Sequence, residues 1–184
     1  MLDPRGDMTD RPDDSIVVTG RLNIRRLRDS DAALIQPLAN NWEIARQTAE
    51  LPFPYTLDDA ARLIEASYVS AKTGKELVFA IVTRESDTLI GLMGLVLDCA
   101  PIEAGYWIGA PYWGNGYASE ALGALRDYAV RRFSCSYLDA VAFDDNLGSI
   151  RVLTKCGFRH FEDTQLDFPT RGGARTVSHY RWRA

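Results

Sequence analysis

The chain has 184 residues, of which 46% are hydrophobic and 25% charged, and its formal net charge is −4. A chain of this size and composition can bury a conventional core within one domain, without metal or disulfide staples. The net negative charge excludes a domain-wide basic footprint for nucleic acid. The two histidines and three dispersed cysteines show neither the spacing of a zinc site nor a disulfide framework, so we expect no metal.

The N-terminal region is expected to be a disordered tail over residues 1–15, because it is rich in Asp, Arg and Pro and poor in apolar residues. It lacks the apolar core of a signal peptide, and nowhere in the chain do about 18 apolar residues run together. We therefore expect a cytoplasmic protein with no membrane contact, in which residues 16–184 form a single domain.

In the first half of the chain, helices give way to strands. A half-buried strand is predicted at 21–27, and Asp29 or Ser30 can cap a helix that runs to about residue 39. A proline-rich loop precedes a second helix at 56–73. The hydrophobic period then changes to that of strands at 77–82, 89–97 and 102–108, which predict an antiparallel meander.

In the second half, an unbroken apolar stripe predicts a long helix over 118–133. A strand at 137–143 leads to a short helix over 146–156 that ends at Gly157. Strand segments follow at 158–161, 165–168 and 176–182, with Gly172 and Gly173 as a hairpin turn. The predicted fold is α+β (mixed α/β): one central twisted sheet, mostly antiparallel and of about seven strands, flanked by helices.

The segment WGNGYA at 113–118 lies between the last meander strand and the long helix. Two glycines before a helix allow a tight turn and expose successive backbone N–H groups at the positive end of the helix dipole, where phosphate or pyrophosphate binds. Ser119 stands where the dinucleotide fingerprint needs a third glycine, and no P-loop lysine follows, so both nucleotide motifs are excluded. Alone, the glycine pair fits either an anion cradle or a plain structural turn.

Several separated motifs, in the same order, resemble the GNAT acetyltransferase superfamily, particularly its ribosomal-protein-alanine N-acetyltransferase branch. These motifs are TGRL at 19–22, RRL at 25–27, LIGLMG at 89–94, EAGYWI at 103–108, YWGNGYASEAL at 112–122 and NLGSIRVLTKCGF at 146–158. The resemblance spans about residues 19–182. It implies a GNAT-like fold and transfer of an acetyl group from acetyl-CoA to an amine.

The resemblance also implies a coenzyme site, with the acetyl thioester between two splayed strands, those at 102–108 and 137–143. The implied coenzyme-binding residues are Ile108, Trp113, Gly114, Asn115, Gly116, Tyr117, Ala118, Asn146 and Ser149. Backbone amides of 113–118 would hold the pyrophosphate, Ile108 and Asn146 would contact the pantetheine, and Ser149 would lie near the sulfur. The chain departs from many relatives at Pro111, where they carry Gln or Arg, and at Leu153, which excludes their tyrosine general acid.

Acetyl transfer needs a neutral amine, a base and a proton donor for the leaving thiolate. A protein α-amino group, with a pKa of about 7.7–8.0, is neutral near pH 7 far more often than a lysine of pKa about 10.4. Glu103 is the candidate base, although a solvated glutamate or an ion pair is the alternative, and either burial must raise its pKa or a water must relay the proton. Ser149 is the candidate acid, or else an ordinary first-turn helix residue.

Several alternatives remain open at this stage. The acceptor is either a protein N-terminus, bound between the proline-rich loop and the terminal hairpin, or a small amine such as a polyamine or aminoglycoside in an acidic pocket. Possible linings of that pocket are Glu43, Glu50, Asp58 and Asp59. A non-catalytic acyl-CoA-binding module is a further possibility. We expect a monomer or homodimer, and solvated strand faces for the terminal arginines Arg25, Arg26, Arg28, Arg171, Arg175, Arg181 and Arg183.

Overall fold

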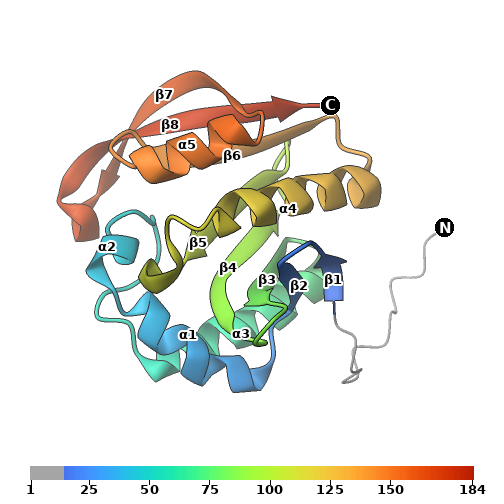
Figure 1. Cartoon of the computed structure of the whole chain (residues 1–184). Coiled ribbons are helices and arrows are strands. Elements are labelled where there is room, and N and C mark those ends of the chain that lie inside the picture. Colours follow the sequence, from blue (N-terminus) through green and yellow to red (C-terminus); the bar gives the residue numbers. More distant parts are fainter. Residues whose placement is uncertain (1–14) are drawn as a thin grey trace.

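The computed structural model describes residues 15–184, so the expected tail lies outside the described residues except for Ser15. Its centre is one eight-stranded sheet with the order β1-β2-β3-β4-β5-β6-β8-β7 (Figure 1). The strands are β1 (Ser15–Val18), β2 (Leu22–Arg26), β3 (Glu76–Thr83), β4 (Leu89–Val96), β5 (Glu103–Ile108), β6 (Tyr137–Phe143), β7 (Arg159–Phe168) and β8 (Gly173–Arg183). All neighbours are antiparallel except β5 and β6. The mostly antiparallel mixed α/β fold is confirmed.

Two local differences bring the strand count to eight. Ser15, expected in the tail, begins β1, which pairs with β2. The segments predicted separately at 158–161 and 165–168 belong to one strand, β7, with an irregularity between His160 and Glu162. The polar run at 162–164 resembles a turn in the sequence. In the structure β7 continues through it, because a bulge adds a residue without ending a strand.

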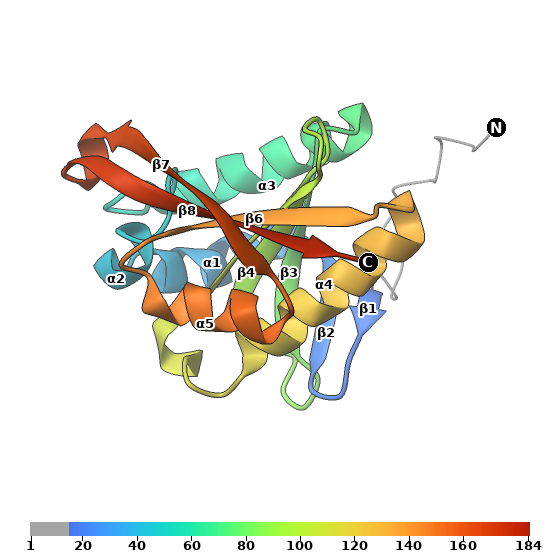
Figure 2. The same ribbon diagram turned by 90° about the horizontal axis from the view of Figure 1, so that it is seen from above.

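The helices lie on both faces of this sheet. They are α1 (Ala32–Ala39), α2 (Trp42–Ala45), α3 (Leu57–Thr73), α4 (Tyr117–Phe133) and α5 (Leu147–Lys155), with 3-10 turns η1 (Asp29–Asp31), η2 (Ala110–Tyr112) and η3 (Pro169–Arg171). One hydrophobic cluster lies between the sheet and α4 with α5, and a second lies between the sheet and α1 with α3. Figure 2 shows α3 on one side of the central strands and α4 with α5 on the other. We call these the α4/α5 face and the α1/α3 face.

Local sequence explains where α3 begins and ends. The Thr56 hydroxyl accepts from the Asp59 N–H, and the Asp59 carboxylate accepts from the Thr56 N–H, which makes a capping box. Gly74 ends the helix in the left-handed conformation, with φ of 69°. The short helix α2 was not indicated by periodicity, because its four residues are fewer than two turns.

The expectation of solvated arginines is wrong for Arg25. This side chain is buried and donates to both carboxylate oxygens of Asp31, each at 2.8 Å. Asp31 is itself 1% exposed and also accepts from the Arg28 N–H. A bidentate pair with a further hydrogen bond offsets part of the desolvation cost that a buried charge incurs. The ion pair therefore fastens β2 to the start of α1.

Within residues 15–184, no helix is long and apolar enough to cross a membrane. The three cysteines are free, and Cys99 is exposed. In the same part of the chain, no group of three or more His, Cys, Asp or Glu side chains is arranged to hold a metal ion.

Candidate active site

The strands β5 and β6 diverge beside the predicted site. They are in register only where Glu103 faces Asp139, and there the Asp139 N–H donates to the Ile102 carbonyl at 2.9 Å. On the other side of β5, the Gly109 N–H donates to the carbonyl of Ile90, in β4, at 2.7 Å. Because strand hydrogen bonds alternate, the backbone groups of Tyr106 and Ile108 must face away from β4, toward the divergence. The main chain there can pair with an extended ligand.

The loop after β5 exposes a run of backbone donors. Gly114 and Gly116 both have φ of 78°, in the left-handed region that glycine adopts without strain. Gly116 caps α4 without a side-chain hydrogen bond, and an added Cβ at Gly114 would meet no atom within 4 Å. Within residues 15–184, the N–H groups of 114–119 donate no hydrogen bond. Six backbone N–H groups without a partner among the described residues therefore lie at or next to the N-terminus of α4, the positive end of its dipole.

The other predicted residues of this loop have defined places. The indole N–H of Trp113 donates to the Ile108 carbonyl at 2.6 Å, which ties the loop to the end of β5. Tyr117 and Ala118 begin α4, so their N–H groups belong to the uncapped first turn. The Asn115 side chain donates to the carbonyls of Tyr112 and Trp113, at 3.2 and 3.1 Å. The side chain of Asn115 therefore shapes the loop from within.

Asn146 and Ser149 lie together at the N-terminus of α5. The Asn146 side chain caps the helix by accepting from the Ser149 N–H at 3.0 Å. The Ser149 hydroxyl is hydrogen-bonded to the Tyr106 hydroxyl at 3.0 Å, which joins α5 to β5. Burial raises the pKa of Tyr106 to about 12, although the hydrogen bond with Ser149 lowers it somewhat. Tyr106 therefore stays protonated, and it can donate to Ser149 while the serine hydrogen points elsewhere.

Glu103 lies at the closed end of the divergence, on the α1/α3 face. Its neighbour two residues along on the same face is Gly105, where an added Cβ would meet no atom within 4 Å. Burial raises the pKa of Glu103, His179 lowers it and the Asp139 carboxylate raises it further. The net shift is upward, as a general base for an ammonium requires. Tyr106 is three residues from Glu103, so its side chain lies on the opposite face of β5, and the Glu103 carboxylate and Ser149 therefore lie on two sides of the sheet.

The terminal hairpin crosses to the N-terminal half of the molecule near α2, as Figure 1 shows for β7, β8 and α2. Arg175 donates to the Arg46 carbonyl and to the Asp145 carboxylate, each at 2.5 Å, and its guanidinium lies over Phe143. Arg171 donates to the carbonyls of Thr48, at 3.1 Å, and Leu51. The prediction of solvated faces is therefore wrong for Arg171 and Arg175, which join the hairpin to the segment 46–51 after α2, and for Arg181, which donates to both carboxylate oxygens of Asp139.

Sequence reasoning missed four partners of the predicted residues. Tyr106 enters the sequence analysis only as part of the EAGYWI motif, and its hydrogen bond to Ser149 depends on how α5 packs on β5. Asp139 and His179, which influence Glu103, come from strands far along the chain. Arg21 donates to the Asn115 carbonyl, in the loop between β5 and α4, across 94 residues of sequence. The TGRL motif was the available signal, but nothing in the sequence indicates what it contacts.

Sequence comparisons show the family of the chain. A family model described as "Acetyltransferase (GNAT) domain" matches residues 21–159. The relative YoaA of Bacillus subtilis, described as an uncharacterized N-acetyltransferase, is 31% identical over 147 residues, which cover 78% of this chain and 82% of the relative.

Solved structures share the fold over nearly the whole chain. RimL, a ribosomal L7/L12 alpha-N-protein acetyltransferase in complex with coenzyme A, has a TM-score of 0.82 at 17% identity and covers 92% of this chain and 97% of its own. MccE, a microcin C7 self-immunity acetyltransferase in complex with acetyl-CoA and AMP, has a TM-score of 0.81 at 19% identity and covers 90% of this chain and 94% of its own.

Proposed function

The chain belongs to the GNAT acetyltransferase family, and from that premise we propose that it transfers the acetyl group of acetyl-CoA to the N-terminal α-amino group of a protein. The observation that supports coenzyme binding is the run of backbone N–H groups at 114–119, which donate to no described residue. They lie directly after the strand whose edge faces the divergence from β6.

The residues present fit the coenzyme. Consecutive backbone donors at a helix N-terminus suit a diphosphate. The backbone groups of Tyr106 and the N–H of Ile108 suit the amides of the pantetheine arm, which would add to β5 as a short strand, while the Ile108 carbonyl accepts from Trp113. Asn146 would contact the same arm through its amide nitrogen, since its oxygen already caps α5. Bound acetyl-CoA supplies the activated thioester on which an amine can act.

On the acceptor side, Glu103 would take a proton from the attacking amine, directly or through one water. A carboxylate of ordinary pKa lies more than 3 units, or about 5 kcal/mol, below an α-ammonium group. Burial beside Asp139 raises the pKa of Glu103 and reduces that difference. An α-amino group requires less of this base than a lysine does, because a larger fraction is neutral near pH 7.

On the coenzyme side, the Ser149 hydroxyl would donate to the leaving sulfur. Tyr106 would hold Ser149 by donating to its oxygen, so that the serine hydrogen is free for the sulfur. This pair would take the place of the tyrosine that many family members carry where Leu153 stands, since Leu153 is fully buried here.

The charged residues around α2 and the terminal hairpin favour a protein N-terminus over a polyamine as the acceptor. Of the acids that could have lined a pocket for a polycation, Asp59 caps α3 and Glu43 pairs with Arg46. The bridge between the hairpin and the proline-rich loop carries Arg171 and Arg175 instead. Arg175 is paired with Asp145, but Arg171 donates only to backbone carbonyls among the described residues, so its positive charge disfavours a polycation and accepts an acidic peptide side chain. The acceptor named for RimL points the same way.

Initial rates with three acceptors test this proposal. One is a peptide with a free N-terminal Ala or Ser and no lysine, the second is the same peptide with a blocked N-terminus and one lysine, and the third is spermidine. We expect thiol release with the first peptide alone. A rate with spermidine that exceeds the peptide rate would identify a small-amine enzyme. Coenzyme binding without thiol release for any amine would identify an acyl-CoA-binding module.

A further inference from the structure

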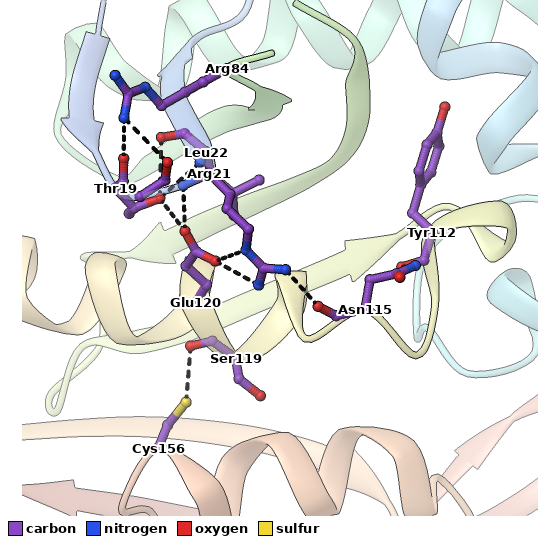
Figure 3. A network of polar contacts seen from close by, with 10 residues as sticks. Thr19, Arg21, Leu22, Arg84, Tyr112, Asn115, Ser119, Glu120 and Cys156 are labelled. Atoms are coloured by element: carbon purple, nitrogen blue, oxygen red, sulfur yellow. Dashed lines mark hydrogen bonds and ion pairs between the residues drawn. The ribbon is translucent and has the colours of Figure 1, made fainter. Parts of the chain in front are cut away.

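One polar network joins the β1–β2 turn to the start of α4 and to the coenzyme loop (Figure 3). Arg21 donates through Nε to Glu120 at 2.7 Å and through Nη1 to the Asn115 carbonyl at 2.9 Å. Glu120 also accepts from the Thr19 hydroxyl at 2.6 Å and from the Arg21 N–H at 2.9 Å. Arg84 donates to the carbonyls of Thr19 and Gly20, which fixes the turn itself.

The bond to Asn115 determines which way one peptide group points. In a trans peptide, the carbonyl and the following N–H point in opposite directions. Because Arg21 holds the Asn115 carbonyl, the N–H of Gly116 is directed away from the guanidinium. The Asn115 side chain holds the Trp113 carbonyl in the same manner, so the Gly114 N–H is directed away from that side chain.

Gly114 and Gly116 make it necessary that side chains fix the direction of these peptide groups. At φ of 78° they permit the required turn, but glycine also populates other regions at little cost, so the backbone alone does not select this arrangement. The guanidinium lies close enough that its Nη2 would be 3.6 Å from a Cβ added at Gly116, and it stacks 4.7 Å from the Tyr117 ring centroid. Arg21 therefore restrains both sides of the second glycine.

We propose that Arg21 is a positioning residue for coenzyme binding: it orients the 115–116 peptide so that the loop's N–H groups converge on the diphosphate. The inference rests on the proposed function, because it concerns the same coenzyme. Glu120 holds the guanidinium in place, and its own carboxylate is kept ionised. Although burial raises the pKa of Glu120, the hydrogen bonds from Thr19 and Arg21 lower it further, so the net shift is downward.

Calorimetric titration with coenzyme A tests this role without turnover. Arg21→Met keeps the alkyl stem and removes the donors, and Arg21→Lys keeps the charge but not the fork that reaches two acceptors. We expect the Kd to rise about 10-fold in Arg21→Met, the change that one charge-assisted hydrogen bond corresponds to, and less in Arg21→Lys. Arg62→Ala, which removes an exposed ion pair with Asp59, is the matched control and should leave the Kd unchanged.

A truncated substrate separates positioning from a general structural effect. Acetyl-pantetheine lacks the diphosphate, so Arg21→Met should match the wild type in kcat/KM with this thioester. With acetyl-CoA, KM should rise and kcat should stay within about 2-fold, the pattern of lost uniform binding. An unchanged Kd for coenzyme A, or an equal loss with acetyl-pantetheine, would overturn the inference alone. A wild-type protein that binds no coenzyme A would overturn the proposed function as well.

Discussion

The proposed coenzyme end and the proposed acceptor end of this site are built from different chemical groups. At the coenzyme end, the donors are backbone N–H groups from one short segment, 114–119, whose glycines and helix start are local in sequence. At the acceptor end, the groups are side chains from separate strands, such as Glu103, Asp139 and His179. Variants at the acceptor end should therefore change the chemistry, and variants at the coenzyme end should change affinity.

The largest effect is expected at the acceptor end, from Glu103→Gln. General-base catalysis contributes about 10²- to 10⁴-fold, so kcat should fall by at least 10²-fold while the Kd for coenzyme A stays unchanged. The base acts when ionised, so the wild-type rate should rise with pH through the raised pKa of Glu103, and this limb should vanish in the variant.

Glu76→Gln is the matched control, because burial also raises the pKa of Glu76 and this residue lies on β3. Its pH–rate profile should keep the acidic limb. If Glu103→Gln retains the same limb, another group is the base.

The next effect is expected at the coenzyme end, from Gly116→Val. A β-branched residue is strained at φ of 78°, so the loop must change shape. If the changed loop loses about two of its hydrogen bonds to the diphosphate, the Kd for coenzyme A should rise about 10²-fold. Gly123→Val, in α4, where an added Cβ meets no atom within 4 Å, is the control for stability effects. Equal affinities in the two variants would refute the backbone cradle.

A smaller effect is expected where the two ends meet, from Tyr106→Phe. The ring is kept and one hydroxyl is lost, so kcat should fall about 10-fold, the equivalent of one hydrogen bond. The double variant with Ser149→Ala should lose little more than Ser149→Ala alone, because Tyr106 acts through the serine. Tyr128→Phe, a half-buried tyrosine on α4, should be neutral. Additive losses would show that Tyr106 acts independently of Ser149.

The smallest effect concerns stability, measured by thermal unfolding of Glu120→Gln between pH 3 and pH 7. The pKa of Glu120 lies below its ordinary value of 4.5, so the unfolded chain binds more protons and stability rises with pH there. The contribution of the ionised Glu120 to the free energy of unfolding is complete above pH 4.5, and it is lost as the pH falls through the folded-state pKa. Since Arg21 is half-exposed, we expect about 1 kcal/mol, or a Tm lower by about 2–4 °C at pH 7. A difference that persists undiminished at pH 3 would exclude this ion pair as its cause.

The same contrast explains what could be predicted from the sequence. Helix limits, the meander and the glycine turn depend on neighbouring residues, and the structure has them within a few positions. The bond between Tyr106 and Ser149 spans 43 residues and that between Arg21 and Asn115 spans 94, so no local pattern contains them. The burial of Arg25 is different, because its partner Asp31 is only six residues away, but the alternation of β2 does not show that an acid of the following turn contacts this arginine.

The central claim is that the backbone of 114–119 binds the diphosphate of the coenzyme, and amide chemical shifts measured during a titration with coenzyme A test it most directly. The account predicts large shifts for the N–H groups of Gly114 and Gly116 and for the first turn of α4, and much smaller ones when pantetheine replaces coenzyme A. The amides of β7 should not move with either ligand. Unshifted amides at 114–119 under saturating coenzyme A would contradict the account.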